Sequence, residues 1–563
     1  MSIEVYEADP EFVLQRFREG EFDYVDGANE ILETSFFRFL QAKKYLAALA
    51  QSYPSPRQKH DVPVWFYVAS NLSMRLHGVH AFHAYPYIVR TGGMLLALGP
   101  DAGRKVTHPE TGDVTLCCEG FNDKNSYDRQ TPADQDFLRK FSKDTEPEAL
   151  EQWFNGDVAR LWRQHKLLCA GTFIGDASYV FVPDNERYER SARMLFDEHD
   201  HPVAAAELER LSPQAAARCR WRRCYKLVSL VYVAPHRAFS LRVALRLLPG
   251  NEHECPVLYE LVDRFVAQVG VGVVRRLILD RGFLDGERIA HCKLQHGIDI
   301  LIPARRNMDV FADVEGLVRA GQLRWKPYQA PVRSPVDAPR LPDAPAPIQR
   351  RERRRQKTLR ARRAETPSPS PQDTVVRTEV SGVQNTRSWQ SCSVPLNVVV
   401  CRDIYGDGHE AYWMLLDTKP LHRRAEHAQR RDEYSLRTEI EEGHRQLKCF
   451  WDLASFTSRS FSLVLNQVVF VILTANLLQV FLRKHQAEHP ERQRRTRTRA
   501  LQLLVPTASV IIIYCQGRFA TLTALEYSEL LLTLAEASRL KILDKTRRLR
   551  RNLDARLRLA RPP

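Results

Sequence analysis

The chain has 563 residues, of which 44% are hydrophobic, so it can bury more than one core and is too long for a single domain. Lysine and arginine number 83 against 68 acidic residues, and the net charge of +15 favours a polyanionic partner, nucleic acid before a membrane surface. The 11 cysteines form no CxxC pair and the first residues carry no basic-then-apolar signal pattern, so a secreted, disulfide-bonded protein is not expected.

Residues 1–150 are predicted to be mainly helical. The stretches VPVWFYVASNLSMRLHG and TPADQDFLRKF carry apolar residues at helical spacing, and the pair Thr131-Pro132 is typical of a helix start. The three histidines in LHGVHAFHAY have a spacing that zinc could use. No matching group of cysteines or histidines accompanies them, so a zinc site is not favoured.

From about residue 165 the pattern becomes rich in β-formers. LLCAGTFIGDASYVFV, CYKLVSLVYVAPH and VVRRLILD are predicted to be strands. DGERIAHCKLQHG is predicted to be a helix, because Asp285 fits an N-cap and Gly297 fits a C-terminal stop. IDILIPA follows as another buried strand. Strands that first form hairpins and later alternate with helices predict a mixed α/β layer structure.

Residues 327–372 interrupt this pattern. Proline-rich stretches flank RRERRRQKTLRARR, which holds nine basic residues and one acid, so the segment is predicted to be a disordered linker or a loop that orders on a partner. VPLNVVVCRD and EAYWMLLDT are then predicted to be strands. VVFVILTANLLQVFL contains Asn476 and Gln479 and is shorter than the ~20 apolar residues that span a bilayer, so it is predicted to be a buried core helix.

The segment DEYSLRTEIEEGHRQLK, residues 432–448, is predicted to be a charged helix. At about 100° per residue, one narrow face of this helix collects Tyr434, Arg437, Glu441 and Lys448, with Arg445 beside it. The two other glutamates nearby point elsewhere, so geometry selects Glu441 if one of them does chemistry. The alternative is an ordinary solvated helix with an Arg437–Glu441 ion pair.

Two aspartates upstream complete a set of three carboxylates. Asp280 directly follows a buried strand, where α/β folds place ligand-binding groups, and Asp285 fits the neighbouring cap better. Asp176 lies between β-rich pieces, where a buried carboxylate needs a cation or hydrogen bonds, whereas Asp184 is explained by a Pro-Asp-Asn turn. With Glu441, these hard oxygen ligands suit two Mg²⁺ or Mn²⁺ ions about 3.5–4 Å apart, as used in phosphodiester displacement.

The four residues Tyr434, Arg437, Glu441 and Lys448 have the spacing Tyr-x2-Arg-x3-Glu-x6-Lys. On this signature, and on LILDRGF and FIGDASYVFV, the chain resembles bacterial insertion-sequence transposases of the DDE type over roughly residues 165–485. It departs from many relatives where Ala177 replaces glycine. The resemblance implies an α/β fold: an RNase H-like mixed-sheet catalytic core with a β-rich insertion, flanked by helical N-terminal and C-terminal regions.

The resemblance also implies a division into parts. In chain order these are a helical region that binds transposon ends, the first part of the core, the β-rich insertion with its disordered basic segment, the second part of the core with the catalytic helix, and a basic region for dimerisation or DNA contact. Their boundaries are 1–150, 151–304, 305–418 (containing 327–372), 419–485 and 486–563.

Roles for the motif residues follow from the resemblance in the same way. Catalysis and the binding of two Mg²⁺ or Mn²⁺ ions are implied for Asp176, Asp280 and Glu441. Contacts with DNA phosphates are implied for Tyr434, Arg437, Arg445 and Lys448.

The implied function is cut-and-paste transposition, with metal-dependent cleavage at the element ends followed by strand transfer into target DNA. The implied partners are double-stranded DNA, as terminal inverted repeats and target, and a second copy of the chain in a synaptic homodimer. No membrane is involved, and the expected location is the cytoplasm, on the nucleoid. Two alternatives use the same residues: an inactive DNA-binding relic or repressor, and a non-specific RNase H-like nuclease.

Overall fold

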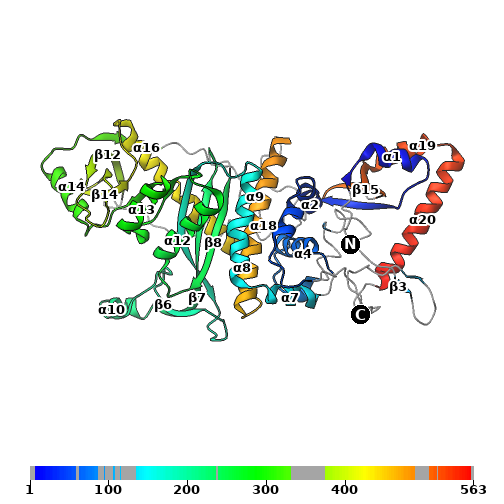
Figure 1. Ribbon diagram of the computed structural model, residues 1–563, viewed down its shortest axis with the longest axis horizontal. Coiled ribbons are helices and arrows are strands. Elements are labelled where there is room, and N and C mark those ends of the chain that lie inside the picture. Colours follow the sequence, from blue (N-terminus) through cyan, green and yellow to red (C-terminus); the bar gives the residue numbers. More distant parts are fainter. Residues whose placement is uncertain are drawn as a thin grey trace. The chain divides into compact units, whose positions relative to one another are not determined.

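The computed structural model describes residues 7–58, 62–85, 94, 106–107, 114–115, 135–235, 239–330, 374–488, 506–516 and 518–559. Two compact units make up the chain (Figure 1). One contains Met1–Leu150, Phe450–Leu482 and Arg497–Pro563, and the other contains Glu151–Cys449 and Arg483–Thr496. The helix start at Thr131-Pro132 and most of the basic, proline-rich segment lie outside the described residues.

The larger unit is built on a ten-stranded mixed sheet. Its core strands are β5 (Gly171–Val182), β7 (Arg220–Val233), β8 (Ser240–Pro249), β9 (Val274–Ile278) and β10 (Asp299–Pro303). They lie in the order β8-β7-β5-β9-β10, and β7 runs antiparallel to the other four. If these five strands are numbered 1 to 5 in chain order, their order in the sheet is 3-2-1-4-5, with strand 2 antiparallel to the rest. This is the order of an RNase H-like core, so the predicted fold is confirmed.

The β-rich insertion continues the same sheet. β14 (Glu410–Asp417) pairs antiparallel with β10, and β13 (Leu396–Tyr405), β12 (Val375–Thr386) and β11 (Lys326–Tyr328) follow in that order. The predicted strands VPLNVVVCRD and EAYWMLLDT are therefore β13 and β14. The insertion is an extension of the core sheet, and its last strand lies directly beside the core strand β10.

Helices pack on both faces of the core sheet. On one face, α12 (Glu254–Val269) lies across β7 and β8 (Figure 1). α13 (Gly286–His296) connects β9 to β10. As predicted, the Asp285 side chain caps α13 by accepting a hydrogen bond from Arg288 N at 3.0 Å, and Gly297 ends it in the left-handed region at φ 66°.

On the opposite face, two helices replace the single helix predicted for DEYSLRTEIEEGHRQLK. α16 (Ala425–Tyr434) ends before α17 (Arg437–Phe450) begins. Between them the bonding tightens to three-residue spacing, because Leu436 N donates to the Glu433 carbonyl at 3.0 Å. The Ser435 hydroxyl also donates to a carbonyl of the preceding turn at 2.6 Å, which is how serine competes with helical bonding.

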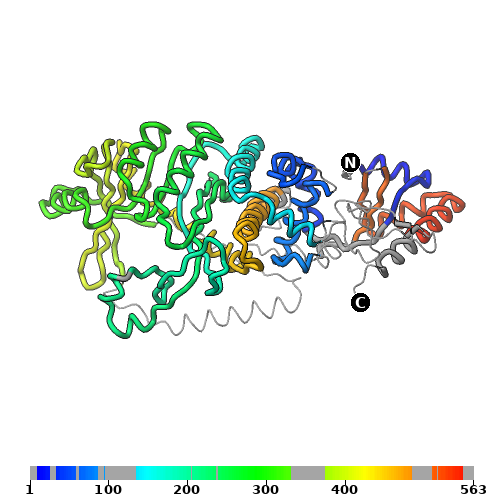
Figure 2. The backbone as a smooth tube through the Cα atoms, turned by 60° about the horizontal axis from the view of Figure 1, so that its bottom comes forward, coloured from blue at the N-terminus to red at the C-terminus, as the bar shows by residue number. Residues whose placement is uncertain are grey.

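The smaller unit joins the two ends of the described chain in one sheet. Its order is β1 (Glu7–Ala8), β16 (Arg518–Thr523), β15 (Pro506–Cys515) and β2 (Tyr24–Ile31). β15 pairs antiparallel with both β2 and β16, so segments almost 500 residues apart lie side by side (Figure 2). The helical pattern of residues 1–150 gave no sign of β2, because YVDGANEI is rich in residues that disfavour strands.

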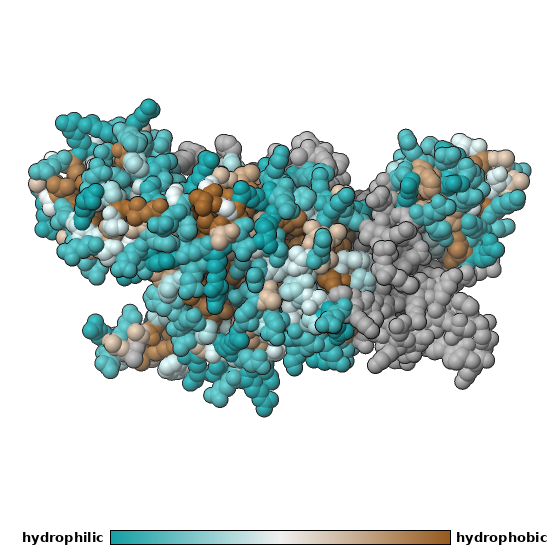
Figure 3. Space-filling model, in the orientation of Figure 1, coloured by the Kyte–Doolittle hydropathy of each residue, from teal (hydrophilic) through white to brown (hydrophobic). Residues whose placement is uncertain are grey.

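Two apolar helices belong to the predicted cores. α4 (Val64–Leu76) is the helix expected for VPVWFYVASNLSMRLHG, and its residues from Phe66 onward are buried. α18 (Phe461–Glu488) is long and apolar enough to cross a membrane by composition, but 89% of its most apolar window is buried inside the protein. It is therefore packed as the core helix that the sequence predicted. The described surface in Figure 3 is mainly hydrophilic, with apolar patches scattered over it.

The other elements are shorter or lie at the edges of the units. They are α1 (Pro10–Arg18), α2 (Leu32–Ala42), α3 (Tyr45–Ser52), η1 (Phe82–Ala84), β3 (Val106–Thr107), β4 (Val114–Thr115), α7 (Gln135–Asp144), α8 (Pro147–Gln152), η2 (Trp153–Val158), α9 (Ala159–Gln164), β6 (Ala192–Phe196), α10 (Ala205–Leu208), α11 (Pro213–Ala216), η4 (Arg281–Phe283), α14 (Asp309–Arg319), α19 (Ala524–Leu532) and α20 (Glu536–Leu559).

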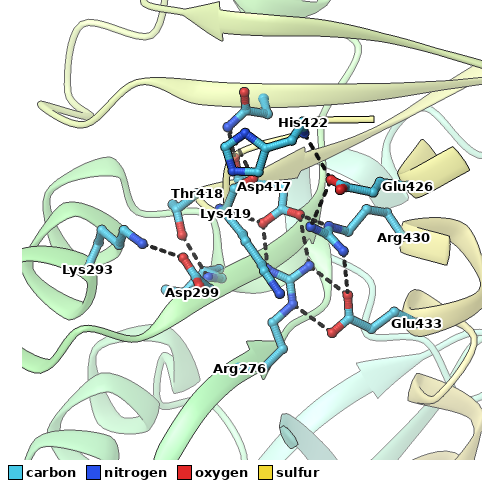
Figure 4. Close-up of polar contacts among 12 residues, drawn as sticks. Arg276, Lys293, Asp299, Asp417, Thr418, Lys419, His422, Glu426, Arg430 and Glu433 are labelled. Carbon is cyan, nitrogen blue, oxygen red and sulfur yellow. Dashed lines mark hydrogen bonds and ion pairs between the residues drawn. The ribbon is translucent and has the colours of Figure 1, made fainter. Parts of the chain in front are cut away.

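A buried ion network joins β9, β14 and α16 (Figure 4). Arg276 of β9 donates to both carboxylate oxygens of Asp417 at 2.5 and 2.9 Å and to both oxygens of Glu433 at 2.9 Å. Arg430 of α16 donates to Asp417 from the other side at 2.6 Å. Burial alone would lower the pKa of Arg276, but its bonds with Asp417 and Glu433 raise that pKa instead. The core, the insertion and α16 are therefore held in one arrangement.

Replacing Asp417 by asparagine keeps the shape of this side chain but leaves Arg276 and Arg430 without their shared counter-charge. We expect Asp417→Asn to lower the free energy of unfolding of the larger unit by about 3–5 kcal/mol, the usual cost of breaking a buried ion pair. Denaturant titration followed by tryptophan fluorescence measures the change. Asp313→Asn, at an exposed position of α14, is the matched control and should change little. Equal, small effects in both variants would contradict the role given to the network.

Candidate functional site

β5 presents two sets of side chains, one to each face of the sheet. Phe173 faces α12, where its ring centroid lies 5.8 Å from that of Phe265. Gly175 faces the same helix so closely that a Cβ there would lie 2.7 Å from a methyl group of Leu258. Because side chains alternate along a strand, Asp176 must point to the opposite face, toward α17.

The opposite face of β5 packs against α17. Ile174 belongs to a buried cluster that includes Ile440 of α17. Four residues further along β5, the Ser178 hydroxyl accepts a hydrogen bond from Lys448 Nζ at 2.8 Å. Asp176 lies between these two contacts, and its side chain is only 14% exposed. Lys448 of the sequence signature is therefore fixed beside the strand that carries Asp176.

The parallel pairing of β5 with β9 explains how Asp280 reaches the same place. Ile174 is in register with Ile278, the last residue of β9. Asp176 and Asp280 each lie two residues beyond this pair, so the parallel register brings them to the same region, where the Asp280 charge acts on the Asp176 carboxyl group. Asp280 stands just beyond the strand end, and its side chain is 35% exposed. The sequence prediction for its position at a strand terminus is confirmed.

Arg437 connects the third carboxylate to the other two. Its Nη2 lies 3.2 Å from Asp280 Oδ2, and its Nη1 donates to Glu441 Oε1 one turn along α17. Burial works to lower the pKa of Arg437, but the charges of Asp280 and Asp176 outweigh it, so the pKa is raised. Asp280 and Glu441 thus contact one guanidinium group, and the charge of Asp176 acts on the same group.

The buried Asp176 carboxylate has a perturbed pKa. Its burial raises its pKa to about 6, and the charges of Asp280 and Glu441 act in the same direction. Arg437 and the hydrogen bond from Ala177 N at 2.9 Å oppose this rise without cancelling it. Any cation that enters the site would strongly stabilise the ionised form of this buried carboxylate.

Two buried residues behind Asp176 were not predicted from the sequence. His444 Nε2 lies 3.9 Å from Asp176 Oδ2, and Arg242 Nη2 lies 3.5 Å from His444 Nδ1. Burial, helped by the charges of Arg242 and other nearby cations, lowers the pKa of His444 well below its usual value. A neutral His444 that accepts from Arg242 at Nδ1 carries its proton on Nε2, which faces Asp176.

A β-bulge in β8 explains how Arg242 reaches this face. Leu230 pairs with Ala244, but the next residue of β7, Val231, pairs with Arg242, so one residue of β8 is left out of the ladder. Without that shift Arg242 would stand opposite Tyr232, on the α12 face. No local sequence pattern reveals such a shift, and for this reason the arginine was missed.

Gly443 makes room for that arginine. A Cβ at this position would lie 2.9 Å from Arg242 Nη2 and 3.1 Å from Nη1. The guanidinium group is buried, so it has little freedom to move away. The glycine in IEEGHRQLK is therefore required by the close approach of Arg242 to α17 and not by the helix itself, which a glycine weakens.

Tyr434 and Arg445, the other two residues predicted to contact DNA, have different surroundings. Tyr434 is half-buried and packs against the core cluster around Ile440. Arg445 makes two hydrogen bonds, at 2.6 and 2.7 Å, to Glu442 on its own helix. Of the predicted DNA contacts, Arg437 bonds two of the carboxylates and Lys448 bonds the strand of the third. Tyr434 lies near enough that the charges of Asp280 and Glu441 help burial to raise its pKa to about 12.

Comparison with known proteins places this arrangement in a family. A family model described as the transposase DDE domain matches residues 194–477, half of the chain. The matched range contains Asp280 and the whole segment from Tyr434 to Lys448, whereas Asp176 precedes it. The chain belongs to the transposase DDE domain family.

A weak likeness to a solved structure carries no part of this assignment. The chain is similar to the cryo-EM structure of the piggyBac transposase synaptic complex with hairpin DNA, with a TM-score of 0.35 and 10% sequence identity. The similarity covers 86% of this chain and 82% of that one. No curated protein matches the sequence.

The residues of the transposase fit the divalent metal ions that DDE enzymes use. The site offers three carboxylates, and a single cation, the Arg437 guanidinium, already contacts two of them. The third, Asp176, is buried with a raised pKa, so a divalent ion that keeps water and phosphate ligands would also stabilise its ionised form. Asp176, Asp280 and Glu441 would hold the ions.

The perturbed pKa of Asp176 makes a prediction for the metal-free transposase. A carboxyl group whose pKa is raised on folding lowers stability progressively as pH rises from its unfolded pKa to its folded pKa, and the full cost is present above the folded pKa. We expect Asp176→Asn to stabilise the protein by about 3 kcal/mol at pH 8 and by much less at pH 4, because about two pKa units separate the folded and unfolded states.

Thermal unfolding in EDTA at the two pH values measures this effect. Asp313→Asn, at an exposed position of α14, is the control and should show no such pH dependence. Mg²⁺ should stabilise the wild type at pH 8 more than it stabilises Asp176→Asn. A gain in Asp176→Asn that is equal at both pH values would refute the assignment of a strained, ionised carboxylate.

Proposed function

We propose that Asp176, Asp280 and Glu441 hold two Mg²⁺ or Mn²⁺ ions with which this transposase cuts the ends of its element and joins them to target DNA. The observation that carries the proposal is their meeting around Arg437, from β5, the end of β9 and α17. When bound, the ions would activate the attacking oxygen and stabilise the leaving oxygen of the phosphodiester.

Within this proposal Arg437 has different partners in the empty site and in the site loaded with ions and DNA. Without ions or DNA it neutralises Asp280 and Glu441, as described above. Once divalent ions supply that positive charge, the guanidinium group is free to bind a phosphate of the transposon end as a planar, bidentate donor. The same side chain would thus keep the empty site stable and hold the DNA in the loaded one.

Behind the site, His444 and Arg242 are positioning residues. They touch neither DNA nor metal in this proposal, and they hold the Asp176 carboxylate from the rear. A neutral His444 can donate its Nε2 proton to one carboxylate oxygen after a small approach from 3.9 Å, which leaves the other lone pairs of Asp176 for the ions.

The partners in this proposal are double-stranded DNA and a second copy of the chain. Lys448 and Tyr434 would contact the phosphates of the terminal inverted repeat together with Arg437, while Arg445 would join them on leaving Glu442. The Tyr-Arg-Glu-Lys spacing supports assignment to the bacterial insertion-sequence group. We place the reaction on nucleoid DNA in the cytoplasm, in a synaptic homodimer that pairs two ends, with the smaller unit and the basic C-terminal region contributing to end or dimer contacts.

The carboxylates are tested by isosteric substitution. We expect Asp280→Asn and Glu441→Gln to reduce Mg²⁺-dependent strand cleavage by roughly 100-fold or more, because each removes a charged metal ligand, while binding of end DNA survives. Cleavage of a labelled end fragment and a gel shift on the same DNA measure the two properties.

Glu439→Gln on another face of α17 is the matched control and should cleave normally. Wild-type cleavage rates in Asp280→Asn or Glu441→Gln would rule out the proposed metal ligands. Cleavage that requires the inverted repeat separates the transposase from a non-specific nuclease, and any Mg²⁺-dependent cleavage excludes an inactive relic or repressor.

Phosphate contact by Lys448 is tested through salt. We expect Lys448→Ala to weaken binding of end DNA about equally for all sequences and to reduce the slope of log K against log salt by about 1, the value for one neutralised phosphate. Fluorescence anisotropy at several salt concentrations measures the slope. Lys166→Ala, at an exposed position, should leave it unchanged. An unaltered affinity and slope in Lys448→Ala would show that this lysine only bonds Ser178 of β5 and does not contact DNA.

A further inference from the structure

A second group of possible metal ligands lies on the face of the core occupied by α12 and α13. In the described part of the chain, Asp263, His291 and His296 are the one trio of His, Cys, Asp or Glu residues whose ligand atoms all lie within 4.8 Å of one another. Asp263 comes from α12 and both histidines from α13. The trio is separate from the three carboxylates, which stand on the opposite face of the sheet.

The three side chains converge in a definite way. Nε2 of His296 lies 2.8 Å from Asp263 Oδ1, and Nε2 of His291 lies 3.5 Å from the same oxygen. In a tetrahedral zinc site with bonds of about 2.0–2.1 Å, neighbouring ligand atoms are about 3.3 Å apart. The two measured distances lie on either side of this value, so a zinc ion can be accommodated by small rotations of the side chains.

The other carboxylate oxygen already has a partner. Arg288, also on α13, donates from Nη2 to Asp263 Oδ2. That contact orients the carboxylate so that Oδ1 faces both imidazole rings, as a hydrogen-bonding partner outside the ligand set commonly does in metal sites. Asp263 would therefore bind through one oxygen, and Arg288 would stay in place.

Exposure also suits a three-ligand site. The side chains of His296, Asp263 and His291 are 17%, 31% and 39% exposed, so solvent can supply a fourth ligand. Two imidazoles and one carboxylate are preferred by Zn²⁺ over Mg²⁺, which binds chiefly oxygen. The plain alternative is a helix-to-helix hydrogen bond between His296 and Asp263, with the His291 ring packed edge-on against the His296 ring at 5.2 Å between centroids. Zinc binding distinguishes the two.

We propose that Asp263, His291 and His296 form a zinc site that fastens α12 to α13. On binding, the Nε2 proton of each neutral histidine moves to Nδ1, and the freed Nε2 lone pairs bind the ion. The site lies near the segment that carries Asp280, because Tyr259 of α12 donates to the Phe283 carbonyl at 2.8 Å. Zinc would therefore stiffen the support of that segment without entering the DNA-cutting site.

The test measures zinc bound to the full-length transposase. Protein stripped with EDTA is titrated with Zn²⁺ against a chelating dye in excess Mg²⁺, which occupies carboxylate-only sites. We expect His291→Asn and His296→Asn each to hold one zinc fewer than the wild type, or to bind it at least about 100-fold more weakly. Zn²⁺ should also raise the unfolding temperature of the wild type more than that of either variant.

His409→Asn is the matched control, because His409 pairs with Asp407 at 2.6 Å on the β13–β14 turn with no second histidine in the pair. It should bind zinc as the wild type does. Co²⁺ gives an independent readout, since a tetrahedral site produces visible absorption that both α13 variants should lose. Equal zinc binding and equal Co²⁺ spectra in the wild type, His291→Asn and His296→Asn would overturn the proposal, even if DNA cleavage were normal in all of them.

Discussion

The buried network in which Arg276 and Asp417 bind Glu433 and Arg430 fixes where α16 lies on the core sheet, and α17 follows directly after it. Arg276, Ile278 and Asp280 alternate along one face of β9 and its extension, and each meets these helices. Arg276 bonds Glu433, Ile278 shares a cluster with Ile440, and Asp280 pairs with Arg437. A slip of one residue in β9 would turn all three to the wrong face, so the ion network also protects the register on which the carboxylates depend.

The site is built at the expense of local stability. Three acidic side chains converge at a place where one of them, Asp176, is almost fully buried, and burial of a charge is costly unless a partner offsets it. Arg437 supplies that partner in the absence of metal. Such a conflict between local stability and charge is typical of functional sites. Under the proposed function, release of Arg437 by divalent ions would make the binding of ions and the binding of DNA depend on each other.

The sequence predicted what local signals encode. The caps of α13, the strands β13 and β14 and the position of Asp280 after β9 were all predicted, because capping residues, alternation and a strand-end acid are short-range features. What it could not give depends on distant pairing: the bulge that turns Arg242 toward Asp176, the strand β2, and the trio on α12 and α13. The break between α16 and α17 at Ser435 was not predicted. A single serine hydroxyl competes only weakly with helical hydrogen bonds, so tertiary contacts decide whether the helix breaks there.

The small sheet that unites β2 with β15 has a consequence for synthesis. β2 leaves the ribosome early, yet its partner emerges only after residue 515, when most of the polypeptide has been made. Pairing over so long a separation is slow, and the early strand must wait for its partner while the larger unit can fold ahead of it. Completion of the smaller unit therefore depends on synthesis of β15, and chains that end before residue 515 would lack its finished sheet.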